Sequence, residues 1–78
     1  MKIELYRQNG MLAVKQWIVI DGIVKYFSYN YAPWIACTVR NYKMGEEFLY
    51  SQPEDIKSFS SIGKVKDLTE GELMLELL

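Results

Sequence analysis

The hydrophobic pattern of residues 11–29 predicts two β-strands joined by a tight turn. The segment MLAVKQWIVIDGIVKYFSY holds two runs of apolar, β-branched and aromatic residues, separated by Asp21-Gly22. Asp-Gly between two such runs is typical of a type I′ hairpin, because both central residues of that turn take positive φ. Asn9-Gly10 is a second signal of this kind, between KIELYRQ and MLAVKQW. The sequence therefore predicts a three-stranded antiparallel meander.

Two-residue loops would fix the register of both predicted hairpins. The first loop places Leu5 opposite Val14, and the second places Trp17 opposite Tyr26. Because side chains alternate across a strand, one face becomes an apolar core and the other is mixed. The predicted core face carries Met1, Ile3, Leu5, Leu12, Val14, Ile18, Ile20, Ile23, Phe27 and Tyr29. The mixed face carries Lys2, Glu4, Tyr6, Ala13, Lys15, Trp17, Val19, Val24, Tyr26 and Ser28.

The segment after the meander predicts two further strands. Pro33 removes a backbone donor and restricts the residue before it, so residues 30–33 are expected to form a loop. Residues 34–43 (WIACTVRNYK) predict a fourth strand, Met44-Gly45 a turn, and residues 46–50 a short fifth strand. The aromatic residues of the loop, Tyr31 and Trp34, suit either a binding loop or a cover for the open end of the sheet.

The remainder of the chain predicts one or two helices. Ser51-Gln52-Pro53-Glu54 reads as a capping box with proline in the first turn, and Gly63 ends the expected helix. Residues 64–78 allow two interpretations. Thr69 with Glu72 reads as another capping box, while the alternation of residues 72–77 fits the second strand of a hairpin. Helix propensity favours the helix. The fold class expected is α+β: an antiparallel meander sheet of about five strands with one or two C-terminal helices, as a single domain over residues 1–78.

Composition narrows the setting and the chemistry. The chain has 78 residues, half of them hydrophobic, with no histidine and one cysteine. Neither a secretory signal peptide nor a disulfide framework is visible, so we expect a cytoplasmic protein. The usual zinc and iron–sulfur ligand sets, a phosphate-binding glycine loop and an activated nucleophile are all missing, so we expect no metal, no cofactor and no catalysis. Cys37 is expected to be a buried structural thiol.

Charge is distributed unevenly along the chain. Residues 1–43 carry a net charge of +4 and residues 44–78 a net charge of −5. This polarity suits a basic and an acidic partner site, or head-to-tail self-association. It also suits an acidic half that only caps helices and keeps the protein soluble.

The mixed face of the predicted sheet is the candidate binding site. Its aromatic and aliphatic centre with charged edges is typical of protein interfaces. The residues concerned are Trp17, Tyr26, Val19, Val24 and Tyr6, with Lys2 and Lys15 at the rim. We expect a small regulatory, adaptor or inhibitory protein that binds another protein, or itself as a homodimer, and no membrane. The same face would also suit single-stranded nucleic acid, although the acidic pI of about 5.3 argues against it. In a third interpretation, the C-terminal segment covers this face and both faces are core.

Overall fold

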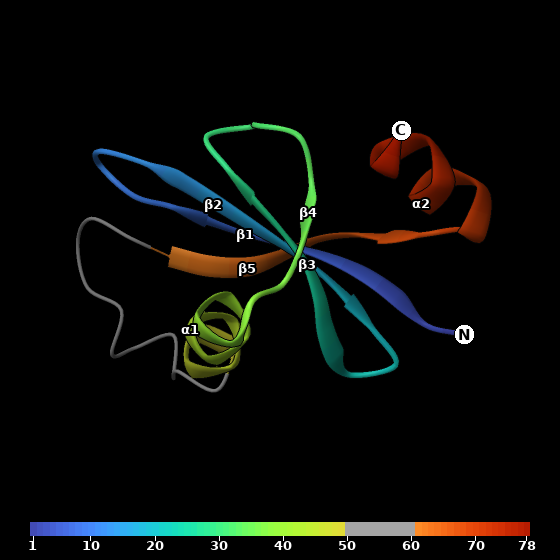
Figure 1. Ribbon diagram of the computed structural model, residues 1–78, viewed down its shortest axis with the longest axis horizontal. Helices are drawn as coiled ribbons and strands as arrows, with labels where there is room; N and C mark the ends of the chain where they lie inside the picture. The colour runs from blue at the N-terminus through green and yellow to red at the C-terminus, as the bar shows by residue number, and fades with distance from the viewer. Residues whose placement is uncertain (50–60) are drawn as a thin grey trace.

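The computed structural model describes residues 1–49 and 61–78. Within them, five strands form one antiparallel sheet in the order β4-β3-β2-β1-β5, and two helices complete an α+β fold (Figure 1). The strands are β1 (Ile3–Asn9), β2 (Val14–Ile20), β3 (Ile23–Tyr29), β4 (Ile35–Ala36) and β5 (Ser61–Leu68), and the helices are α1 (Val39–Leu49) and α2 (Glu70–Leu77). The predicted fold class is confirmed, although β5 and α1 come from other residues than expected and β4 is only a short part of the predicted fourth strand.

The β2–β3 turn is the one that the sequence predicts. Asp21 and Gly22 have φ of 49° and 80°, and Ile20 pairs with Ile23 across the turn. Asp21 also accepts a hydrogen bond from the backbone N–H of Lys2 at 2.8 Å, which ties the turn to the start of the chain.

The β1–β2 connection differs from the two-residue loop predicted at Asn9-Gly10. Asn9 pairs with Val14, so four residues make the loop, closed by a hydrogen bond from Gly10 N–H to Ala13 O at 2.9 Å. The observed register places Leu5 opposite Ile18 instead of Val14. Apolar residues thereby face apolar residues across the strands, a pairing that stabilises a sheet. Because the register moves by an even number of residues, each side chain keeps its predicted face.

A β-bulge in β3 moves three aromatic residues, Tyr26, Phe27 and Tyr29, to faces opposite to those predicted. The pairing shifts after Val19–Val24, so that Ile18 lies opposite Tyr26 and Trp17 opposite Phe27. The extra residue in the bulge inverts the alternation of every later position in the strand. The predicted Trp17–Tyr26 pair is therefore wrong.

Helix α1 takes the place of residues 39–43 of the predicted fourth strand and of residues 46–49 of the predicted fifth, whose last residue lies outside the described residues. The fourth strand is only β4, and the helix begins after Thr38, whose hydroxyl accepts a hydrogen bond from Asn41 N–H at 3.2 Å. Gly45 lies inside the helix and not in a turn. A Cβ at this position would lie 2.8 Å from ring atoms of Trp17. Glycine therefore allows the helix to approach the sheet closely, and tertiary packing outweighs the strand-like composition of this segment.

The C-terminal capping box is confirmed, and the hairpin interpretation is wrong. Thr69 Oγ1 accepts from Glu72 N–H, and the Glu72 carboxylate accepts from Thr69 N–H, both at 3.1 Å. The helix predicted from Ser51 lies outside the described residues as far as residue 60, and its predicted end at Gly63 belongs to β5.

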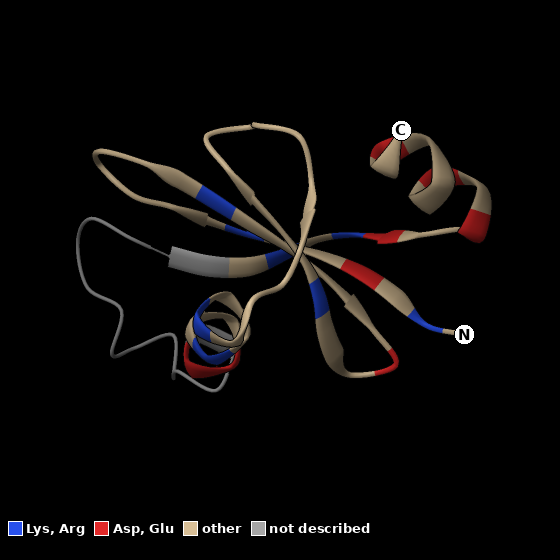
Figure 2. Ribbon diagram, viewed as in Figure 1, with Lys and Arg blue, Asp and Glu red and all other residues tan. Residues whose placement is uncertain are grey.

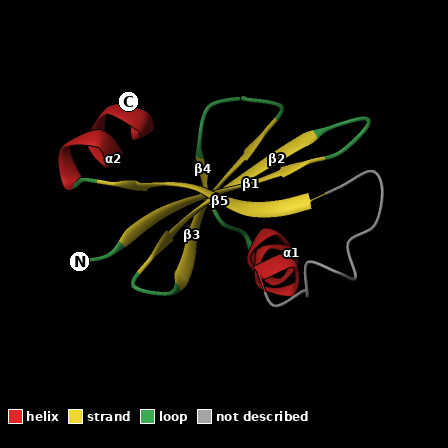
Figure 3. Ribbon diagram, turned by 180° about the vertical axis from the view of Figure 1, so that it is seen from behind, coloured by secondary structure: helices red, strands yellow, loops and turns green. Residues whose placement is uncertain are grey.

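Both faces of the sheet are core. One cluster contains Ile3, Leu5, Ile18 and Leu68, with Leu73 and Leu77 of α2 packed against it. The other contains Trp17, Val19, Val24 and Phe27, with Met44 of α1 packed against it. The two helices thus cover opposite faces, and they lie well apart when the molecule is seen from either side (Figures 1 and 3).

Candidate functional site

The predicted binding patch is buried under α1. Trp17 is 0% exposed, and Val19 and Val24 are buried beside it. The Trp17 ring packs against Phe27 at a centroid distance of 5.6 Å. The expectation that this face meets solvent is therefore wrong. The interpretation that both faces are core holds, but the helix on this face is α1 and not the C-terminal segment.

The other aromatic residues of the predicted patch are divided between the two faces. Tyr6 lies opposite Trp17 and is half-buried against the same cluster. Tyr26 is half-buried on the other face, packed with the core that α2 covers. The bulge in β3 separates Tyr26 from Trp17, and a strict two-residue period gives no sign of it.

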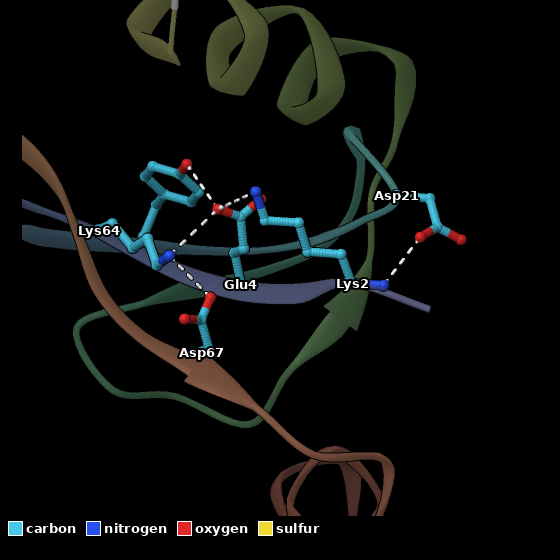
Figure 4. Close-up of polar contacts among 6 residues, drawn as sticks. Lys2, Glu4, Asp21, Lys64 and Asp67 are labelled. Atoms are coloured by element: carbon cyan, nitrogen blue, oxygen red, sulfur yellow. Dashed lines mark hydrogen bonds and ion pairs between the residues drawn. The ribbon is translucent and has the colours of Figure 1, made fainter.

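Lys2 belongs to a charged cluster on β1 and β5, centred on the buried Glu4 (Figure 4). The Glu4 carboxylate accepts a hydrogen bond from the Tyr6 hydroxyl at 3.2 Å, and the ammonium groups of Lys2 and Lys64 each lie 3.6 Å from it. Lys64 also pairs with Asp67 at 2.7 Å. Opposite charges thus surround a carboxylate that burial would otherwise disfavour, so the cluster joins β1 to β5.

The titration of this cluster follows from its contacts. Burial and the adjacent Glu4 carboxylate raise the pKa of Tyr6 above its ordinary value of 10.0. The hydrogen bond to Asp67 raises the pKa of Lys64 above 10.5. Tyr6 and Lys64 are protonated at neutral pH, as they would be at their ordinary pKa values, and the upward shifts reflect how the neighbouring carboxylates favour this form. Among the described residues, no group of three or more histidine, cysteine, aspartate or glutamate side chains is arranged to hold a metal ion.

Lys15 lines a hollow between the sheet and α1, which we call the basic groove. Its volume is about 390 Å³, and it is lined by Ala13, Lys15, Phe27, Tyr29, Arg40, Asn41 and Met44. Apolar side chains therefore meet two cations, and none of the described lining residues is acidic. The Lys15 ammonium lies 3.7 Å from the sulfur of Met44. The sequence pattern predicts Lys15 at the edge of a patch, but the groove needs α1, which that pattern does not predict.

The secondary candidate loop packs against α2. The Trp34 indole N–H donates to the Glu76 carboxylate at 3.0 Å, and the Arg7 guanidinium lies 5.5 Å from the ring centroid of Tyr31. The loop and the end of α2 enclose a hollow of about 340 Å³. Tyr31 is exposed and Trp34 is half-buried, so the loop covers one end of the sheet while leaving one aromatic ring in solvent.

Cys37 lies between β4 and α1, not within a strand. It is half-buried, and burial raises the pKa of its thiol above 9.0. It lines a second hollow beside α1, of about 370 Å³, whose one cationic lining residue among those described is Lys25. A raised pKa leaves the thiol protonated at neutral pH, which is the unreactive form.

Three strongly exposed apolar side chains lie together on the far side and at the C-terminal end of α2. Met74, Leu75 and Leu78 are 70%, 72% and 100% exposed, and we call them the outer face of α2. The inner side is formed by Leu73 and Leu77, which pack against the sheet. A helix that is apolar on both sides is normally buried on both sides, and a soluble helix otherwise places polar residues outward. In the sequence, the corresponding signal is the closely spaced run of leucines and methionine.

Searches of protein-family models, of curated proteins and of solved structures find no match for this chain. In the described part of the chain, neither helix is long and apolar enough to cross a membrane.

Proposed function

We propose that this protein is a small, non-catalytic protein-binding factor, of a regulatory, adaptor or inhibitory kind, whose binding surface is the outer face of α2. The observation that carries the proposal is the exposure of Met74, Leu75 and Leu78 on a helix whose opposite side already packs against the sheet. Exposed apolar groups that lie together commonly mark protein interaction sites. The aromatic patch of the sheet is not available for this role, because α1 covers it.

The size of the outer face sets the strength of binding that we expect. Fully burying a leucine or methionine side chain contributes about 1.5–3 kcal/mol, so three contribute about 4–9 kcal/mol. Association also costs several kcal/mol in lost translational and rotational freedom. The outer face therefore acts as an anchor, and reversible micromolar binding, which needs a net gain of about 8 kcal/mol, requires further contacts from a complementary surface around it.

Photo-crosslinking tests this proposal for a partner that has not been identified. A photoreactive amino acid replaces Met74 in the full-length chain, which is then expressed in the cells that make the protein. The matched control carries the same group at Leu12, which is 95% exposed at the tip of the β1–β2 hairpin, far from α2 in sequence and on another element. We expect discrete protein adducts from position 74, lost when Leu75→Glu is added, and none from position 12.

Two results would overturn the proposal. Identical adducts from positions 74 and 12 would indicate general adhesion of exposed apolar groups. Adducts that nuclease removes would identify nucleic acid as the ligand and favour the alternative function.

A further inference from the structure

Helix α2 has one acidic residue beside its apolar outer face. Glu70 lies four residues before Met74, and therefore on the same side of the helix. Glu72 and Glu76 are the other charged residues of α2 (Figure 2), and they point away from Met74 and are bonded to Lys66 and Trp34. A surface that suits the outer face therefore offers apolar contacts with a positive charge beside Glu70.

The basic groove has that composition. Its apolar part is formed by Ala13, Phe27 and Met44, and its cations are Lys15 and Arg40. Its volume of about 390 Å³ lies at the lower end of the range found for binding pockets, which suits a few side chains and not a whole domain. The hollow beside Cys37 is similar in size but has only Lys25 as a described cationic lining residue.

A chain cannot bring its own α2 to its own basic groove in this fold. The groove lies on the face of the sheet that α1 covers, with Phe27 in its wall, whereas Leu73 and Leu77 hold α2 to the opposite face. The groove and the helix can therefore meet only between two molecules. The cations of the groove belong to residues 1–43, whose net charge is +4, and α2 belongs to residues 44–78, whose net charge is −5. The overall charges therefore favour the same contact.

We propose that the outer face of α2 binds the basic groove of a second copy of this chain. This inference rests on the proposed function and names its partner. The outer face and the groove lie on opposite sides of the sheet, so one partner cannot fill both at once, and the contact generates a closed ring or an open chain of copies and not an isologous pair. Because charges lie on both sides of the contact, we expect added salt to weaken it.

Arg40 and Glu70 allow a charge-reversal test that leaves the fold intact. Both residues are exposed, and each lies in the first turn of its helix. A cation in the first turn opposes the helix dipole, so Arg40→Glu removes an unfavourable local interaction in α1. Glu70→Lys leaves the capping box of Thr69 and Glu72 in place but opposes the dipole of α2, at a small cost to the helix that mixing with a second variant would not recover. The matched control is Lys25→Glu, which makes the same charge change in the other hollow.

Sedimentation velocity of the purified chain, up to a concentration on the order of 100 µM, measures the association. We expect the wild type to associate reversibly beyond the monomer. Arg40→Glu and Glu70→Lys should each weaken association by roughly tenfold or more, because each sets like charges against each other. Lys25→Glu should associate as the wild type does.

An equimolar mixture of Arg40→Glu and Glu70→Lys gives the decisive measurement. In the mixture, the altered helix of the Glu70→Lys variant meets the altered groove of the Arg40→Glu variant. The unaltered helix of the Arg40→Glu variant meets the unaltered groove of the Glu70→Lys variant, so both contacts join opposite charges. We expect the mixture to recover association that neither variant shows alone.

Three outcomes would overturn the inference: a wild-type monomer at the highest concentration, equal effects of Lys25→Glu and Arg40→Glu, or no recovery in the mixture. If position 74 still crosslinks to a different protein, the proposed function stands and only the choice of partner fails. If position 74 gives no protein adduct at all, the proposed function fails as well.

Discussion

Replacing Trp17 by alanine tests whether the second face of the sheet is core. Trp17 is 0% exposed, and it contacts Phe27 and the backbone of α1 at Gly45. Removing a buried tryptophan costs about 3–5 kcal/mol, which includes the cavity left behind. A chain of 78 residues has a total stability of about 4–12 kcal/mol, so the substitution removes about a quarter of it or more.

Urea unfolding monitored by far-ultraviolet circular dichroism measures this loss. For a short chain the slope is about 1 kcal/mol per molar urea, so the midpoint of Trp17→Ala should fall by about 3 M or more, unless the variant is already unfolded in buffer. The matched control is Trp34→Ala. That residue is half-buried and donates one hydrogen bond to Glu76, so its loss should cost about 1–2 kcal/mol. Equal midpoints for the two variants would refute the assignment of Trp17 to a core and return its face to solvent.

Two other predictions concern α1 and α2. Gly45→Ala should lower the free energy of unfolding, because overpacking against the Trp17 ring costs about 1–3 kcal/mol while alanine's helix propensity returns about 1 kcal/mol. Gly63→Ala, whose Cβ meets nothing within 4 Å, is the control and should be neutral or stabilising; a Gly45→Ala variant more stable than wild type would contradict the close approach. The hydrogen bond from Thr69 N–H, and then the contact with Lys66, lower the pKa of Glu72 below 4.5, so its contribution to stability is present above pH 4.5 and is lost as the pH falls through the lowered value. At neutral pH the urea midpoint of the wild type should therefore lie above that of Glu72→Gln, and the difference should shrink as the pH is lowered towards about 3. A difference that stays the same at acid pH would exclude this linkage.

The parts of the fold that the sequence predicts are those set by local backbone chemistry. Asp21-Gly22 requires positive φ at two successive residues, and few sequences other than Asp-Gly and Asn-Gly supply it. Thr69 and Glu72 satisfy each other's backbone donors at a helix start, independently of the rest of the chain. Each signal contains its own physical reason within four residues, and each is confirmed.

Apart from the β1–β2 loop, where Asn9-Gly10 does not form the predicted two-residue turn, the parts that the sequence misses depend on distant contacts. Residues 39–49 contain β-branched and aromatic residues together with a glycine, and they form a helix because Met44 and Gly45 pack on Trp17 and its neighbours. The bulge in β3 leaves no mark in the alternation of residues 23–29. Because the sequence does not predict α1, the face of the sheet that carries Trp17 is expected to meet solvent. This one error in secondary structure places the candidate site on a buried surface. The basic groove is out of reach of the sequence for the same reason.

Helix α2 is held to the sheet by few contacts, so its stability depends on what covers its outer face. None of the residues of α2 is fully buried, and its attachment relies on Leu73 and Leu77 together with the contacts of Glu72 and Glu76. A helix of eight residues is too short to be stable by itself in water, so these contacts determine how often it is formed. A partner that buries the outer face binds only the folded helix, and it therefore stabilises the helix by mass action. Under the proposed function, binding and the folding of α2 are therefore one coupled equilibrium. The exposed apolar residues of the free protein are the ones that the partner contacts.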